Sequence, residues 1–199
     1  SVRKYMGSTA GGDEGGNAIP CYEQIYALAG PTQTWRIVGG TEIKEDIDQT
    51  ISFLNRYYKD HGPNGGYYSH IDPVTFDAKA ESLGVNKAKK NWNSVGDHAP
   101  AYLINLYLAT GDENYGRFLE DTFDTICDHF PDYGYSPFMN EKFFDDWSHD
   151  LKWGIHPARC VVGHNLKVAW NLTRMHSLTP KESYKTFAHQ IADAIPAAG

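Results

Sequence analysis

Hydrophobic residues recur every three or four positions along most of this chain, which is the spacing of one face of an α-helix. We expect a kink at Gly30-Pro31 in the first helix, and a turn that leads into a short strand in residues 62–72. Residues 73–90 are polar and irregular and indicate a long loop. The predicted helices are residues 21–38, 41–60 and 97–110, a fourth after the break at residues 111–112 that contains residues 119–130, and then 162–178 and 180–194. The pattern predicts an all-α fold of about five to six helices with short β-turns or hairpins in its loops.

Two of these helices repeat one another. The apolar positions of the second helix recur seventy-two positions later in the fourth: Ile47, Ile51, Leu54 and Tyr58 match Leu119, Phe123, Ile126 and Phe130. Gly39 matches Gly111 by the same shift. A repeat of two helices and a loop is typical of helical arrays and toroids. We therefore treat residues 1–199 as one domain, with 1–19 as an N-terminal loop segment.

The predicted helix 162–178 is apolar around most of its circumference. Its polar residues fall in one narrow arc of the helical wheel: His164, Lys167, Asn171 and Arg174. Trp170 lies on the apolar side, which predicts a place in the core. The arc suits an inner helix that lines a wet cavity, but it equally suits an amphipathic helix facing water.

Charge and length exclude several classes of protein. The chain has 199 residues, enough for one sizeable core, and a formal net charge of -7, which would repel a phosphate backbone. Nucleic acid is therefore not an expected partner. No apolar run has the length of a membrane span, and residues 1–5 lack the apolar core of a signal peptide. We expect no membrane association and a cytoplasmic location.

The cysteines and the glycine-rich segment suggest no special chemistry. Cys21, Cys127 and Cys160 are far apart and odd in number, which argues against a disulfide framework and against a thiolate zinc site. Residues 11–16 are glycine-rich but lack the lysine of a phosphate-binding loop. We expect no cofactor.

Several motifs resemble the N-acylglucosamine 2-epimerase and cellobiose 2-epimerase family. The stretch Gly163-His164-Asn165-Leu166-Lys167-Val168-Ala169-Trp170-Asn171-Leu172 is similar to that family's Gly-His-Asp-Ile-Glu-x-x-Trp-Leu-Leu motif. Gly65-Gly66-Tyr67-Tyr68, Lys90-Asn91-Trp92-Asn93 and Phe144-Asp145-Asp146-Trp147 resemble other family stretches, in the family's order. The likeness covers residues 20–178, with 179–199 as an additional helix. It implies an (α/α)6 toroid, of which this chain would be a partial barrel because family members are much longer.

The resemblance also implies where the chemistry lies. In that family, the His of the Gly-His motif and a second His near the C-terminal end of the barrel exchange the proton at sugar C2. His164 corresponds to the first, and the second has no counterpart here. The family's Glu three residues after the motif His is Lys167, which removes a carboxylate partner and favours neutral His164. Another family His falls on Asp97, next to His98, where a helix N-terminus would also favour neutral His.

Proton transfer at C2 needs a base, donors to the C1 and C2 oxygens, and a platform for the sugar ring. The resemblance makes His164, His98 and Lys167 the catalytic candidates. The candidate substrate-binding residues are Asp97, Asn93, Trp147, Arg159, Asn171, Tyr22 and Glu23. Capping or packing explains Asn93, Tyr22 and Glu23 about as well.

Three functions stay open from the sequence. The leading one is a sugar 2-epimerase or aldose-ketose isomerase acting at the reducing end of a mono- or oligosaccharide. A glycoside hydrolase or lyase on the same toroid would use Asp97, Asp145 or Asp146 as acid and base. A third is a non-catalytic carbohydrate-binding or interaction fragment.

No metal site is expected. The loop groupings of histidine and aspartate lack the i, i+4 helical pairing of zinc sites: His61, His70 and Asp72, and His149, Asp150 and His156. An open part of a ring would expose apolar helix faces, so we expect a homo-oligomer or the missing remainder of the barrel as a partner.

Overall fold

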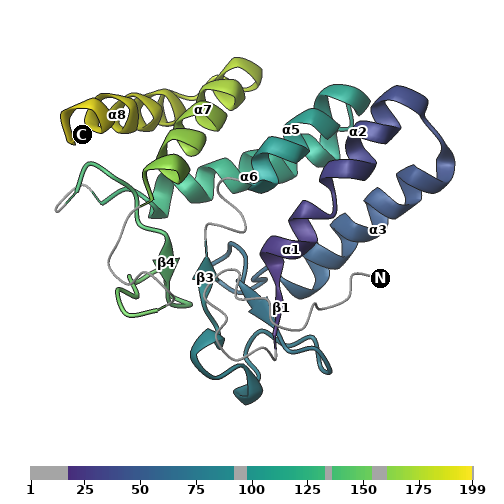
Figure 1. The fold of residues 1–199 in the computed structure, drawn as a ribbon, viewed down its shortest axis with the longest axis horizontal. Coiled ribbons are helices and arrows are strands. Elements are labelled where there is room, and N and C mark those ends of the chain that lie inside the picture. The colour runs from purple at the N-terminus through teal and green to yellow at the C-terminus, as the bar shows by residue number, and fades with distance from the viewer. Residues whose placement is uncertain (1–17, 92–97, 133–135, 154–160, 199) are drawn as a thin grey trace.

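The computed structural model describes residues 18–91, 98–132, 136–153 and 161–198. Seven α-helices lie within these residues: α1 (Cys21–Tyr26), α2 (Ala29–Val38), α3 (Thr41–Tyr57), α5 (His98–Thr110), α6 (Glu113–His129), α7 (Val162–Leu178) and α8 (Glu182–Ala198). They form three antiparallel units: α1 and α2 with α3, α5 with α6, and α7 with α8 (Figure 1). The predicted all-α architecture is confirmed. None of the helices in the described part of the chain is both long and apolar enough to cross a bilayer.

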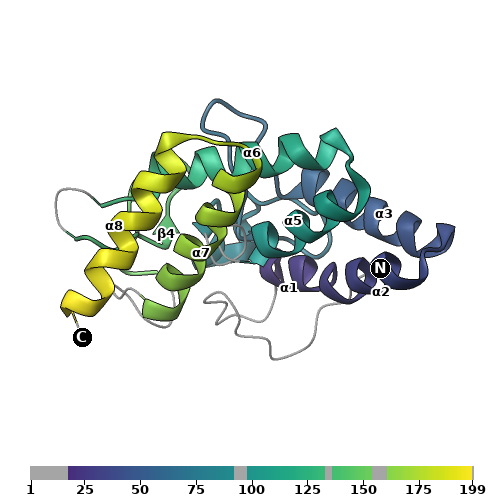
Figure 2. The same ribbon diagram turned by 90° about the horizontal axis from the view of Figure 1, so that it is seen from above.

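The units stand side by side in an arc of two layers (Figure 2). The first layer holds α1, α2, α5 and α7, and the second layer holds α3, α6 and α8. Polar bridges tie the second layer together: Lys44 Nζ on α3 donates to Tyr115 on α6 at 2.8 Å, and Tyr184 on α8 donates to Asp124 on α6 at 2.7 Å. Consecutive elements thus pack against their sequence neighbours, as in helical repeats.

The first predicted helix is divided in two, which raises the number of helices above the expected five to six. The break falls at Ala27–Leu28, before the predicted kink at Gly30-Pro31. A proline ring clashes with the carbonyl four residues earlier, and for Pro31 that is the carbonyl of Ala27. Pro31 therefore lies in the first turn of α2, where its missing N–H costs nothing.

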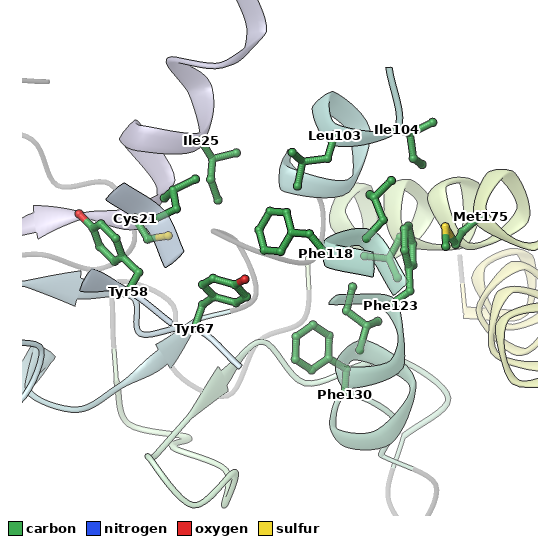
Figure 3. Packing of buried hydrophobic residues seen from close by; sticks show 14 of the residues in the cluster. Cys21, Ile25, Tyr58, Tyr67, Leu103, Ile104, Phe118, Phe123, Phe130 and Met175 are labelled. Carbon is green, nitrogen blue, oxygen red and sulfur yellow. The ribbon is translucent and has the colours of Figure 1, made fainter. Parts of the chain in front are cut away.

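The predicted repeat forms the centre of the core. All eight residues that match across the shift of seventy-two positions are buried, each at most 8% exposed. Six lie on α3 and α6, and Tyr58 and Phe130 directly follow these helices. Side chains of α1, α5, α6 and α7 meet there in one cluster (Figure 3). Each fully buried side chain of this size contributes about 1.5–3 kcal/mol. The periodic pattern is therefore the main source of the helical packing.

Short strands form a layer of loops at one end of the helices. β1 (Ile19–Pro20) pairs antiparallel with β2 (His70–Ile71), and β3 (Lys90–Asn91) pairs with β4 (Lys142–Phe143). A 3-10 helix, η2 (Glu81–Asn86), lies within the segment predicted as a long loop. Figure 1 shows this layer below the helices, where α1 and α7 begin. The β3–β4 pair joins the loop after α3 to the loop after α6.

α7 exposes apolar side chains that the sequence places in the core. Trp170 is 55% exposed, so its predicted burial is wrong, and Leu166 and Val162 are exposed at i−4 and i−8 from it. These three residues share one face of the helix because of this spacing. The buried face instead contains Val168, Leu172 and Met175, which pack into the core cluster.

We predict that the exposed face of α7 associates with other helices. At micromolar concentrations, sedimentation velocity should show self-association of this chain, and Trp170→Glu should weaken it at least tenfold because a carboxylate resists desolvation. Val74→Glu is the control, since Val74 is also an exposed apolar residue but lies in a loop. A wild-type chain that stays monomeric at all concentrations would contradict the prediction.

Candidate functional site

The candidate site lies where the first-layer helices meet the loop layer. α1, α5 and α7 each follow a loop or strand, and the N-termini of α1 and α7 point toward the loop layer (Figure 1). Helix N-termini carry a partial positive charge, which favours neutral histidine and negatively charged groups nearby. His164 is in the first turn of α7, at this end of the molecule.

His164 is paired with a buried carboxylate. Its Nδ1 lies 3.3 Å from Oε2 of Glu141, whose side chain is 4% exposed, whereas the His164 side chain is 28% exposed. The other oxygen, Oε1, accepts the backbone N–H of Val161 at 3.1 Å. Sequence reasoning missed Glu141 and assumed that Lys167 left His164 without a carboxylate partner.

The side chain of Asn165 links the segment that contains Glu141 to the start of α7. Its Oδ1 accepts the Met139 N–H at 3.0 Å, and its Nδ2 donates to the Val161 carbonyl at 3.1 Å. The N-cap residue, Val161, has no side chain that could cap the helix. Asn165 and Glu141 therefore supply polar contacts that the helix start lacks.

The rest of the polar arc of α7 is covered rather than turned to bulk water. Asn171 is completely buried, and Lys167 and Arg174 are half-buried. Arg174 Nη2 donates to Asn105 Oδ1 on α5 at 3.0 Å, and its guanidinium lies 4.8 Å from the centroid of the Trp170 ring. The arc thus turns partly toward α5, and burial lowers the pKa of Arg174.

Trp147 packs between the loop that follows α3 and the loop that follows α6. Its ring stacks on His129 with centroids 4.3 Å apart, and its Nε1 donates to the Asn64 carbonyl at 2.7 Å. Lys90 Nζ lies 4.7 Å from the ring centroid. Trp147 has φ 67, a rare conformation for a bulky residue, which indicates that its surroundings hold it in place. Its predicted role as a sugar platform stays a prediction beside this packing role.

Lys90 is the buried cation that joins the loops. Its side chain is 1% exposed, and Nζ donates to Asp60 Oδ2 at 2.9 Å and to the Gly65 carbonyl at 2.6 Å. Asp145 Oδ1 lies 3.9 Å from Nζ and accepts a hydrogen bond from Tyr68 at 2.7 Å. The next residue, Lys89, pairs with Asp150 at 2.5 Å. Paired lysines and aspartates therefore hold the loops together.

The remaining predicted site residues are only partly described. Asp97, Asn93 and Arg159 lie outside the described residues, and for His98 and Tyr22 only the backbone is described. Glu23 is half-buried on α1, and its Oε2 is buried without a hydrogen-bond partner among the described residues. α5 stands between α1 and α7 (Figure 2). No contact among the described residues brings Glu23 to His164.

One sequence signal could have revealed Glu141. Met139, Glu141 and Phe143 are all buried, and their spacing of two is that of one face of an extended segment. A carboxylate between two apolar residues on such a face points into the protein.

Within the described residues, no three His, Cys, Asp or Glu side chains gather into a group that could hold a metal ion.

The chain matches no protein-family model and no curated protein. Its fold is nevertheless that of solved sugar enzymes. A cellobiose 2-epimerase from Bacillus thermoamylovorans B4167 matches with a TM-score of 0.75 at 16% identity over 92% of this chain and 46% of the epimerase. A D-mannose isomerase matches with a TM-score of 0.70 at 19% identity over 89% of this chain and 42% of the isomerase.

A second class of enzyme has the same architecture. The GH76A α-1,6-mannanase from Salegentibacter sp. HEL1_6 matches with a TM-score of 0.63 at 17% identity over 89% of this chain and 47% of the mannanase. The chain thus spans less than half the length of each of these structures. The expected (α/α)6 toroid-type fold is confirmed, and this chain aligns with a part of the ring in each matched structure.

We predict a packing conflict on adding a methyl group at Gly66. Both Gly65 and Gly66 have positive φ, so alanine at either position costs about 1–2 kcal/mol in backbone strain. A Cβ at Gly66 would lie 2.4 Å from the Trp147 ring, whereas a Cβ at Gly65 meets nothing within 4 Å. Urea unfolding should therefore show that Gly66→Ala costs about 1–3 kcal/mol more than Gly65→Ala. Equal losses would show that Trp147 is not fixed there.

We also predict that Asp60 contributes stability that depends on pH. Burial alone would raise the pKa of Asp60, but hydrogen bonds from Lys90 and the Gly62 N–H hold it below the ordinary value of 3.8. A carboxyl group whose pKa is lowered by folding stabilises the protein above its unfolded pKa. This stabilisation is lost as the pH falls below 3.8.

Asp60→Asn should therefore cost about 3–5 kcal/mol at pH 7, because Lys90 is left buried without its partner. The variant should also lose less stability than the wild type on acidification, measured by urea unfolding between pH 7 and about pH 3. Glu182→Gln, in an exposed pair with Lys185, is the control and should change stability by less than about 0.5 kcal/mol. A loss as small as that of the control would refute a structural role for the Lys90–Asp60 pair.

Proposed function

We propose that this chain is part of a sugar 2-epimerase or aldose-ketose isomerase that acts at the reducing end of a mono- or oligosaccharide. The observation that carries the proposal is His164, which stands at the start of a first-layer helix of an epimerase-like toroid and is paired with buried Glu141. A partly exposed imidazole beside a buried carboxylate is suited to accept a proton.

The proposed reaction begins when His164 takes the proton from C2 of the open-chain sugar. The C2–H bond breaks, its electron pair forms the C1–C2 double bond, and the carbonyl oxygen at C1 becomes negative. The resulting enediolate is favoured near helix N-termini such as that of α7. Return of a proton to the other face of C2 restores the C1 carbonyl and gives epimerisation. Delivery of a proton to C1 gives isomerisation, because the proton of the O2 hydroxyl moves to O1 and the carbonyl group then forms at C2.

Lys167 and Asn171 follow His164 on the same arc of α7, at i+3 and i+7. We assign Lys167 to donation toward the sugar oxygens as charge develops, since an ammonium group is a strong donor to an oxyanion. Asn171 is completely buried, so its proposed role is to shape the wall behind the sugar rather than to bind it from solvent. His98, at the first position of α5, stays a candidate for the second proton-transfer group.

A glycoside hydrolase is the alternative that the mannanase fold raises. A variant of that mannanase with two consecutive aspartates replaced is described as inactive, and Asp145-Asp146 is a consecutive pair here. A hydrolase needs one protonated acid. Hydrogen bonds from the Ser148 side chain and N–H lower the pKa of Asp146, while Asp145 accepts from Tyr68 and Lys79. These contacts suit loop ties better than acid catalysis and favour the isomerase.

The remaining wall of the sugar site would come from outside the described residues. Less than half of a matching toroid is present, and α7 exposes Val162, Leu166 and Trp170. We therefore expect further helices to complete the ring, supplied either by another copy or by additional chain.

Deuterium exchange tests the proposal. Incubation of cellobiose, D-mannose or D-glucose with the protein in heavy water should place deuterium at C2 or C1, detected by NMR. His164→Gln should lower the exchange rate by at least about 10²-fold because it removes the base. His189→Gln, an exposed histidine on α8, should leave the rate unchanged.

Each other outcome assigns a different function. A new reducing end released from an oligosaccharide without exchange would identify a hydrolase. Sugar binding that persists in His164→Gln, with no turnover of any sugar by the wild type, would identify a non-catalytic binding protein.

A further inference from the structure

Glu141 divides its two oxygens between two different donors. Oε1 accepts the Val161 N–H at the start of α7, and Oε2 faces Nδ1 of His164 at 3.3 Å. The side chain is 4% exposed, so little water competes for either oxygen. An ionised carboxylate has only acceptor sites, and both of these oxygens are directed at ring or backbone nitrogens.

We propose that Glu141 is a positioning residue that fixes His164 in the tautomer with hydrogen on Nδ1; its catalytic consequence rests on the proposed function. Since the carboxylate can only accept, Nδ1 must donate, and the lone pair of the neutral ring is then on Nε2. Nε2 is therefore the atom that takes the sugar proton. The imidazolium formed in that step lies beside a negative charge that stabilises it.

Glu141, which lies in a loop segment, gives His164 the carboxylate partner that the residue at position 167 does not. Lys167 follows His164 by three residues on the helix and is a cation, whereas Glu141 precedes His164 by 23 residues. Burial of Met139 and Phe143 on either side directs Glu141 inward. The β4 pairing with β3 and the Asn165–Met139 hydrogen bond then hold its segment against α7.

A purely structural role for Glu141 would be to hold the start of α7. The variant Glu141→Gln separates the two roles because glutamine has one oxygen and one NH₂ group. If its oxygen keeps the Val161 N–H, its NH₂ faces Nδ1 of His164. Nδ1 must then accept, and the ring hydrogen moves to Nε2. The helix start is kept while the lone pair on Nε2 is lost.

The experiment measures the tautomer and the reaction separately. Two-bond ¹H–¹⁵N correlation spectra, recorded without sugar at a pH where the imidazole is neutral, should show His164 with hydrogen on Nδ1 in the wild type and on Nε2 in Glu141→Gln. The kcat for deuterium exchange should fall about 10²–10⁴-fold, as expected for a base in the wrong tautomer, with KM changed less than about threefold.

Two further variants complete the design. Glu141→Asp keeps an acceptor-only group, so it should keep the Nδ1–H tautomer and exchange at least tenfold faster than Glu141→Gln. This variant also gives a readout if the glutamine protein does not fold. Glu182→Gln removes an exposed carboxylate on α8 and should match the wild type in both measurements.

The proposal is overturned if Glu141→Gln leaves the His164 tautomer unchanged, or if the tautomer changes while kcat does not. It is likewise overturned if Glu141→Asp loses the Nδ1–H tautomer but exchanges at the wild-type rate. If the wild-type protein exchanges no sugar, the proposed function fails. The tautomer comparison still decides in that case whether Glu141 sets the state of His164.

Discussion

The architecture of the loop layer depends on one buried cation, the ammonium group of Lys90. With its side chain 1% exposed, Lys90 must be paired, and its partners come from both long loops: Asp60 and the Gly65 carbonyl from one, and Asp145 and the Trp147 ring from the other. Removing one member of such a pair leaves an uncompensated charge in the interior. The Lys90 contacts and the β3–β4 pairing fix the loops relative to each other.

The Lys90 contacts and the β3–β4 pairing also affect the candidate site, because β4 follows Glu141 directly. Glu141 directly precedes β4, so the position of its carboxylate depends on the same pairing that holds Lys90. The carboxylates of the loops thus make different kinds of contact. Asp60, Asp145 and Asp150 neutralise lysines, whereas Glu141 meets the start of α7 and His164. The loops are thus held to each other by paired lysines, and Glu141 is the loop carboxylate that contacts His164.

The shared fold does not by itself assign a reaction to this chain. Epimerases, an isomerase and mannanases share this toroid at 16–19% identity, and at this level side chains rather than backbone distinguish their chemistry. Here the histidine has a carboxylate partner, while the consecutive aspartates are engaged in loop contacts. That difference is the basis on which we propose proton transfer rather than hydrolysis.

The sequence by itself determined the helices and the repeat, and it singled out His164 as a candidate, because a helical face and a short motif are both encoded in neighbouring residues. It did not reveal the Glu141–His164 pair or the burial of Lys90, since these contacts join segments that are far apart in the chain and have no common period. It also misplaced Trp170 in the core. A helical wheel gives the direction of each side chain around the helix axis, but only the tertiary structure decides which of these directions face another helix.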